Sequence, residues 1–261
     1  MLYRSVFVLL ATLIVGRAAA FELADYRLVD LSHSYGEDTL YWPTSPTAFQ
    51  KETLAYGDSG AGYFYSAYTV CTPEHGGTHI DAPVHFAEGG VSADKLPLEN
   101  LVAPAVVIDV TKKAAEDRNY RVSEADVRDF EKEFGQIEKG TVVLVRTDWS
   151  QYWPDAMDYL GDDTPGDASH LQFPGFGADA MRLLAEERKV SLIGIDTASI
   201  DYGKSQDFIA HRIGATVGVA NLENLTNLQQ LPATGSIIMA LPMKIESGSG
   251  GPVRVVALVP R

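Results

Sequence analysis

Residues 123–146 have the sequence SEADVRDFEKEFGQIEKGTVVLVR and join two kinds of secondary structure. Ser123 is a favourable helix N-cap with Asp126 three residues later, and Gly135 is typical of a residue that ends a helix. The run 141–146 is nearly all apolar, as in strands that are buried on both faces. This part of the chain therefore predicts a helix over residues 123–134, followed directly by a buried strand.

The same pattern extends in both directions along the chain. A second predicted helix, residues 177–188, has Met181, Leu184 and Ala185 on one face and also comes directly before an apolar run. Helices followed by strands indicate one α/β domain with a mixed sheet, since no long linker or repeat divides the chain. The other predicted strands are residues 27–31, 63–70, 105–110, 190–195, 236–241 and 253–259, of which the last four are also expected to be buried on both faces.

The balance of charges limits the class of partner. The chain has 261 residues, with 21 Lys and Arg against 35 Asp and Glu, which gives a formal net charge of -14. We therefore expect no nucleic-acid partner, because that affinity depends mainly on basic residues. The composition fits a small-molecule substrate or a cationic ligand. There is no dinucleotide-binding glycine motif, no nucleophile elbow and no Walker loop.

The first twenty residues, MLYRSVFVLLATLIVGRAAA, have the layout of a secretory signal peptide. The apolar run 5–16 follows a short basic start, is too short to span a membrane, and precedes three alanines that suit cleavage. We therefore predict a secreted or periplasmic protein, residues 21–261, with no membrane association after cleavage. Cys71 is the only cysteine, so no intrachain disulfide can form, and its place after the apolar run 63–70 suggests burial.

The strongest chemical signal is EHGGTHIDAPVHF, residues 74–86, which places three histidines and an aspartate within eleven residues. Two glycines and a proline disfavour a helix here. In a strand, His79 and Asp81 would share one face, and the glycines would let His75 fold back toward the same ion. Imidazole and carboxylate ligands suit Zn²⁺ or Mn²⁺, and a three-ligand site leaves a position for water, as a hydrolase needs. His85, beyond the proline, is better placed as a catalytic group.

Further ligands are less certain from the residues alone. His211 and Glu223 are candidates, twelve residues apart, and Glu223 stands among apolar neighbours that suggest an inward-pointing carboxylate. The alternatives are an ordinary surface histidine at 211 and a helix N-terminal or solvated turn charge at 223. Thr78 either orients the ligand loop or simply packs in it. His33 and His170 are interpreted as structural or cavity-lining residues.

The spacing His75-x3-His79-x-Asp81-x3-His85 resembles the signature of the metal-dependent cyclase family, which includes bacterial kynurenine formamidase and isatin hydrolase. The interval between His211 and Glu223 also resembles that of the family's second ligand pair. Other similar blocks are DLSH (30–33), WP (42–43), RTDW (146–149), FPG (173–175) and GIDTASID (194–201).

The resemblance implies a swivelling β/β/α fold with a mixed sheet, assembled as a homodimer or higher homo-oligomer. It implies a first metal bound by His75, His79 and Asp81. It also implies a second metal, with Asp81 and Glu223 as bridging ligands and His211 completing that site. In the same family pattern His85 donates and accepts protons, and Trp42 stacks on an aromatic substrate.

The leading hypothesis is therefore a metal-dependent hydrolase of amide C–N bonds in a small aromatic or cyclic amide. It would use one or two Zn²⁺ or Mn²⁺ ions per chain and resemble an arylformamidase, which acts in tryptophan catabolism, or an isatin hydrolase. Two alternatives stay open. One is an exported metal-dependent lactonase or dehydratase, and the other is a metal- or ligand-binding protein without turnover.

Overall fold

The computed structural model describes residues 21–261. The predicted signal peptide, residues 1–20, lies outside the described residues, so its cleavage stays a prediction. Within the described part of the chain, no helix is both long enough and apolar enough to cross a membrane.

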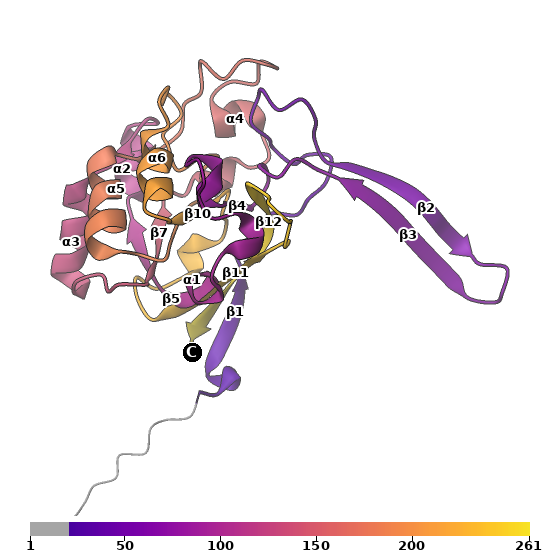
Figure 1. Ribbon diagram of the computed structural model, residues 1–261, viewed down its shortest axis with the longest axis horizontal. Helices are drawn as coiled ribbons and strands as arrows, with labels where there is room; N and C mark the ends of the chain where they lie inside the picture. The colour runs from indigo at the N-terminus through magenta and orange to yellow at the C-terminus, as the bar shows by residue number, and fades with distance from the viewer. Residues whose placement is uncertain (1–20) are drawn as a thin grey trace, which may run out of the picture.

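The centre of the molecule is an eight-stranded mixed sheet in the order β1-β12-β11-β5-β7-β9-β10-β4 (Figure 1). The four strands β5, β7, β9 and β10 run parallel, and the other pairings are antiparallel. β4 also pairs with β12, which closes the sheet on itself. The predicted α/β class with a mixed sheet is thus confirmed. The strands are β1 (Tyr26–Asp30), β4 (His79–Asp81), β5 (Val102–Asp109), β7 (Val142–Arg146), β9 (Leu192–Ile195), β10 (Ala220–Glu223), β11 (Ser236–Pro242) and β12 (Gly250–Pro260).

Helices cover the outer face of the parallel strands (Figure 1). Because side chains alternate along a strand, Val143 and Val145 of β7 pack under α3 and α5, while Leu144 points into the closed sheet. The helices are α1 (Leu98–Leu101), α2 (Thr111–Glu116), α3 (Glu124–Phe134), α4 (Ala156–Leu160), α5 (Ala178–Arg182), which continues as a π-helix (Leu183–Arg188), and α6 (Ile209–Thr216). Short 3-10 helices span Leu23–Asp25, Pro83–His85, Ala93–Lys95, Trp149–Tyr152 and Leu228–Gln230.

The predicted helix over residues 123–134 is confirmed together with its cap. The Ser123 side chain accepts a hydrogen bond from the backbone of Asp126, whose carboxylate in turn accepts one from the Ser123 backbone. The second predicted helix begins as α5 and ends as the π-helix. Burial on both faces holds for the central strands β7 and β9 but is wrong for β11 and β12, where Leu241 and Arg254 are exposed. Helices cover the parallel strands, and the antiparallel strands keep one face in water.

A long two-stranded hairpin, which we call the arm, projects from the body of the molecule (Figure 1). It consists of β2 (Gln50–Asp58) and β3 (Phe64–Cys71), and nearly every side chain on it is exposed. The predicted burial of Cys71 is therefore wrong: the thiol is exposed, because no other layer of the described chain covers this sheet. The short strands β6 (Arg121–Val122) and β8 (Gly175–Phe176) form a further small pair.

Candidate metal centre and substrate cavity

Strand β4 places two of the predicted ligands on one face. His79 and Asp81 share a face, while Ile80 between them points into the core. β4 pairs with β10 in a register that sets His79 opposite Glu223 and Asp81 opposite Asn221. Residues opposite each other in a ladder share a face, so all four polar side chains meet at one place.

The two glycines before β4 reverse the chain as predicted. Gly76 has φ +145° and Gly77 has φ +57°, and a Cβ on Gly77 would lie 2.7 Å from the Tyr35 ring. Neither the backbone conformation nor the space suits a larger residue. The turn brings His75 back over β4, where its Nδ1 lies 2.6 Å from Asp81 Oδ1.

His211 joins the same cluster from helix α6. Asp201 accepts hydrogen bonds from the backbone N–H and the Nδ1 of His211, at 3.1 and 2.7 Å. This arrangement leaves His211 Nε2 3.1 Å from Asp81 Oδ2 and 3.0 Å from Glu223 Oε1. His211 is thus a buried residue and not a surface histidine, and Glu223 ends a buried strand instead of lying in a solvated turn.

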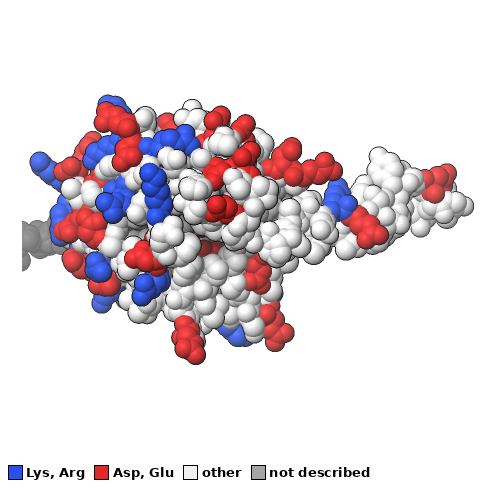
Figure 2. Space-filling model, turned by 90° about the horizontal axis from the view of Figure 1, so that it is seen from above, with Lys and Arg blue, Asp and Glu red and all other residues white. Residues whose placement is uncertain are grey.

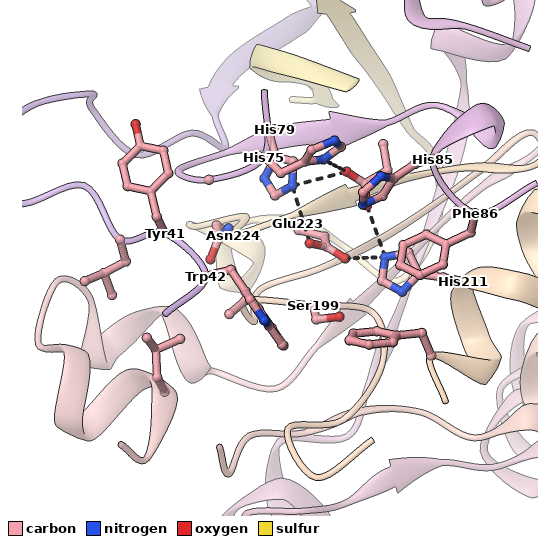
Figure 3. Close-up of a pocket in the computed structure, with 16 residues that line it drawn as sticks. Tyr41, Trp42, His75, His79, His85, Phe86, Ser199, His211, Glu223 and Asn224 are labelled. Atoms are coloured by element: carbon pink, nitrogen blue, oxygen red, sulfur yellow. Dashed lines mark hydrogen bonds and ion pairs between the residues drawn. The ribbon is translucent and has the colours of Figure 1, made fainter. Parts of the chain in front are cut away.

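The five residues form two groups that share Asp81. The first group is His75, His79 and Asp81, and the second is Asp81, His211 and Glu223. Within each group, one ligand atom from each residue lies within 4.8 Å of the others. Figure 3 shows the imidazoles of His75, His79 and His211 and the carboxylate of Glu223 turned toward one another.

Hydrogen bonds on the far side of two imidazoles fix which nitrogen faces the cluster. His79 Nδ1 lies 2.9 Å from the Gly77 carbonyl, an acceptor only, so this nitrogen carries a proton. His211 Nδ1 donates to Asp201 in the same way. In the neutral rings, both Nε2 lone pairs then point at carboxylate oxygens. Lone pairs and carboxylates repel unless a cation lies between them, and this donor set fits Zn²⁺ or Mn²⁺.

The pKa shifts in the cluster show that the electrostatic potential there is negative. Burial lowers the pKa of His79, but the charges of Asp81 and Glu223 outweigh burial and raise it to about 9. Burial also opposes protonation of His211, and hydrogen bonds to Asp201, Asp81 and Glu223 nevertheless raise its pKa well above the usual value. The imidazoles hold the pKa of Asp81 well below its usual value in spite of burial. The cluster attracts positive charge, whether protons or a metal ion.

A cavity of about 280 Å³ opens beside the cluster. Its aromatic wall is a chain of rings from Trp42 through Phe208 to Phe86, with centroids 6.0 and 5.5 Å apart, and Phe86 lies 4.4 Å from the His211 ring. Trp42 thus lies on the cavity wall, where the resemblance placed it (Figure 3). The cavity joins the cluster to a surface that suits a flat apolar molecule.

His85 lies in the 3-10 helix after β4 and lines the same cavity. Its ring stacks on His75 with centroids 3.8 Å apart and remains exposed at the cavity. Neither group of potential ligands includes it. His85 is therefore placed beside the cluster and at the cavity, where it can reach a bound molecule.

Comparison with known proteins agrees with this geometry. The model of the Cyclase family, described as "Putative cyclase", matches residues 29–202, which is more than half of the chain. The chain belongs to the cyclase family.

Relatives in the cyclase family include enzymes that act on amides. Isatin hydrolase of Roseibium aggregatum is 35% identical over 208 residues, which cover 77% of this chain and 77% of the relative. Kynurenine formamidase of Salinibacter ruber is 31% identical over 229 residues, which cover 88% of this chain and 96% of the relative. Among solved structures, isatin hydrolase A from Labrenzia aggregata, bound to benzyl benzoate, aligns with a TM-score of 0.82 and 34% identity over 91% of this chain and 95% of that one.

Two buried residues of this cyclase-family site were not predicted. Asn221 Nδ2 donates to Asp81 Oδ2 at 2.9 Å, and Asp201 orients His211. Asn221 and Glu223 are two residues apart in β10, as His79 and Asp81 are in β4, and this spacing could have indicated that Asn221 shares a face with Glu223. Nothing near Asp201 in the sequence points to a histidine ten residues away.

The remaining predicted residues separate into loop support and surface. Thr78 Oγ1 donates to the backbone of Asn224 at 2.6 Å and accepts from the backbone of His33 at 2.9 Å, so it holds the ligand loop. His33 stacks on Trp153 with centroids 4.2 Å apart, and burial lowers its pKa to about 4, as suits a structural residue. His170 is exposed and does not line the cavity.

Replacing Gly77 by alanine tests the ligand turn. Gly77→Ala should lower the free energy of unfolding by about 1–3 kcal/mol more than Gly140→Ala, measured by urea denaturation in the presence of a chelator. Both glycines have positive φ, but a Cβ on Gly140 meets no atom within 4 Å. Equal losses in the two variants would show that the close approach of Tyr35 has no energetic effect.

Proposed function

We propose that this protein is a metal-dependent hydrolase that cleaves the amide C–N bond of a small aromatic or cyclic amide. The observation that supports this most directly is the convergence of five ligand-type side chains beside an aromatic-walled cavity that also exposes His85. The relatives that are named isatin hydrolase and kynurenine formamidase favour the same reaction class.

His75, His79 and Asp81 would hold one Zn²⁺ or Mn²⁺ ion, and Asp81, His211 and Glu223 would hold a second. A divalent ion bound there supplies Lewis acidity, which lowers the pKa of water to about 7 and polarises a carbonyl group. The shared carboxylate of Asp81, within reach of ligand atoms in both groups, supports a two-ion centre.

The protein's own residues supply positioning and proton transfer. His85 lies at the cavity with an exposed imidazole, so it can take a proton from water and pass it to the leaving nitrogen. Trp42, Phe208 and Phe86 would stack on the flat part of the substrate. A substrate stacked on this wall would face both the ligand cluster and His85.

The charge of the cavity favours a neutral substrate. The sixteen residues that line it include Asp81 and Glu223 but no Lys and no Arg. Away from the proposed ions, a free carboxylate on the substrate would therefore find no basic side chain in the cavity walls of the described chain, and desolvating a charge that is left unpaired there is costly. A neutral lactam such as isatin fits this lining better than the amino acid N-formylkynurenine.

A substrate panel tests this preference and the rival functions. We expect kcat/KM for isatin to exceed that for N-formylkynurenine by roughly tenfold or more, with simple formanilides between them. The reverse order would contradict the argument from cavity charge. Faster turnover of lactones than of any amide would favour the lactonase, and no turnover of any substrate by the metal-loaded protein would favour a binding function.

Replacing His85 by alanine tests its proposed role. His85→Ala should lower kcat by a factor on the order of 10² to 10⁴ while leaving the bound metal, measured by elemental analysis, unchanged. His170→Ala is the matched control, because His170 is exposed and away from the cavity, and it should change neither quantity. Loss of metal from His85→Ala would mean that His85 is a ligand.

We further propose that the protein assembles as a homodimer or higher homo-oligomer through the arm. Register and ring contacts place Tyr56, Phe64, Tyr68 and Val70 on one face of the arm, and all four are exposed. An isolated hairpin is marginally stable in water, so this face needs a partner.

Charge and area favour a second copy of this chain as that partner. The arm contains only Lys51, Glu52 and Asp58 as charged residues and appears largely white in Figure 2, whereas the whole chain has a net charge of -14. Two chains with this net charge repel each other, and the repulsion is weakest between surfaces with few charged residues, such as the arm. Exchange of two arms would bury on the order of 1,000 Å² of aromatic surface, close to the size of a specific interface.

Substitutions on the aromatic face test the assembly. The double variant Tyr56→Ser and Phe64→Ser should sediment as a monomer at micromolar concentration, where we expect the wild-type protein to sediment as a dimer or larger species. Leu98→Ser is the control, because Leu98 is equally exposed but lies in α1 and not on the arm. A monomeric wild-type protein, or an unchanged sedimentation of the double variant, would contradict this assembly.

A further inference from the structure

His75 differs from the other two imidazoles in where its outer nitrogen points. His75 Nε2 lies 2.7 Å from the hydroxyl of Ser249, a residue 174 positions later in the chain. The Ser249 hydroxyl and backbone N–H both donate to Glu74 Oε2, at 2.6 and 2.9 Å. A chain of hydrogen bonds therefore runs from Glu74 through Ser249 to His75.

The direction of each hydrogen bond follows from the donors available. A carboxylate only accepts, so Glu74 takes the single proton of the Ser249 hydroxyl. The Ser249 oxygen can then only accept from His75, which places the imidazole proton on Nε2. In the neutral ring, His75 Nδ1 is then left as a lone pair, and it is this nitrogen that lies 2.6 Å from Asp81 Oδ1 in the cluster.

We propose that Glu74 and Ser249 are positioning residues that hold His75 in the orientation and tautomer needed to bind metal through Nδ1. This inference rests on the proposed metal centre. His79 and His211 have equivalent acceptors in the Gly77 carbonyl and Asp201, so the pair completes a set in which every imidazole is held from behind. Such outer partners typically affect metal affinity by 10- to 100-fold.

Close packing keeps Ser249 in place. The flanking glycines, Gly248 and Gly250, have no room for a side chain: a Cβ would lie 2.9 Å from Glu74 Oε1 in the first case and 2.7 Å from His75 Cε1 in the second. Gly250 also begins β12 and pairs with Asp81. Residues 248–250, at the start of β12, are therefore packed directly on the ligand turn.

Metal affinity is the first test. Zn²⁺ binding to the purified, metal-free protein is measured by competition with a chromophoric chelator. Ser249→Ala and Glu74→Ala should each weaken binding by roughly 10- to 100-fold, and Glu74→Gln should weaken it less, because its amide oxygen can still accept. The controls Ser247→Ala and Glu246→Gln, in the same segment, should bind like the wild type. Melting temperatures of the metal-free variants show whether each one folds.

Two further measurements separate positioning from a general structural effect. The double variant Glu74→Ala and Ser249→Ala should bind no more weakly than the worse single variant, because the two residues act on His75 in series. Nitrogen-15 NMR of the metal-free imidazoles should place the His75 proton on Nε2 in the wild type and lose that preference in Ser249→Ala.

The possible failures are distinguishable. Wild-type affinity together with an unchanged His75 tautomer in Ser249→Ala would overturn the role of the pair while leaving the metal centre intact. A wild-type protein that binds no Zn²⁺ or Mn²⁺ would overturn the proposed function itself.

Discussion

The repulsion among buried acceptors is the constraint on which the rest of this structure depends. Two carboxylates and three imidazoles meet where His79, Asp81, His211 and Glu223 are all buried. Such a cluster is costly unless positive charge enters it. The closed sheet, the glycine turn and the anchoring of α6 on Asp201 all serve to hold these groups together against that cost.

The sequence predicted the parts of the site that are local in the chain. Alternation placed His79 and Asp81 on one face, and two glycines were enough to predict the return of His75. His211 and Glu223 could not be settled in the same way, because only the β4–β10 pairing and the packing of α6 bring them to Asp81. Asn221 alternates with Glu223 along β10, but only the β4–β10 pairing brings it to Asp81, so its place in the site could not be settled from the sequence either.

Helices and strands were predictable where the sequence itself marks where they begin and end. The cap at Ser123 and the stop at Gly135 defined α3, and the central apolar runs defined β7 and β9. The run 63–70 was misleading because an apolar strand looks the same whether a second layer or a partner molecule covers it. That ambiguity explains the wrong prediction for Cys71, since apolar composition does not distinguish the arm from the core.

The double pairing of β4 would link metal binding to the integrity of the closed sheet. This three-residue strand hydrogen-bonds to β10 on one side and to β12 on the other, so it joins the first and last parts of the described sheet, together with the bridge between Ser32 and Leu225. An ion held by His79 and Asp81 would bind the protein while the sheet is closed and not after β4 has separated from its neighbours. By mass action, the concentration of a free metal ion that binds there would set how far the equilibrium lies toward the closed sheet, and so how rarely the chain unfolds locally and becomes open to proteolysis.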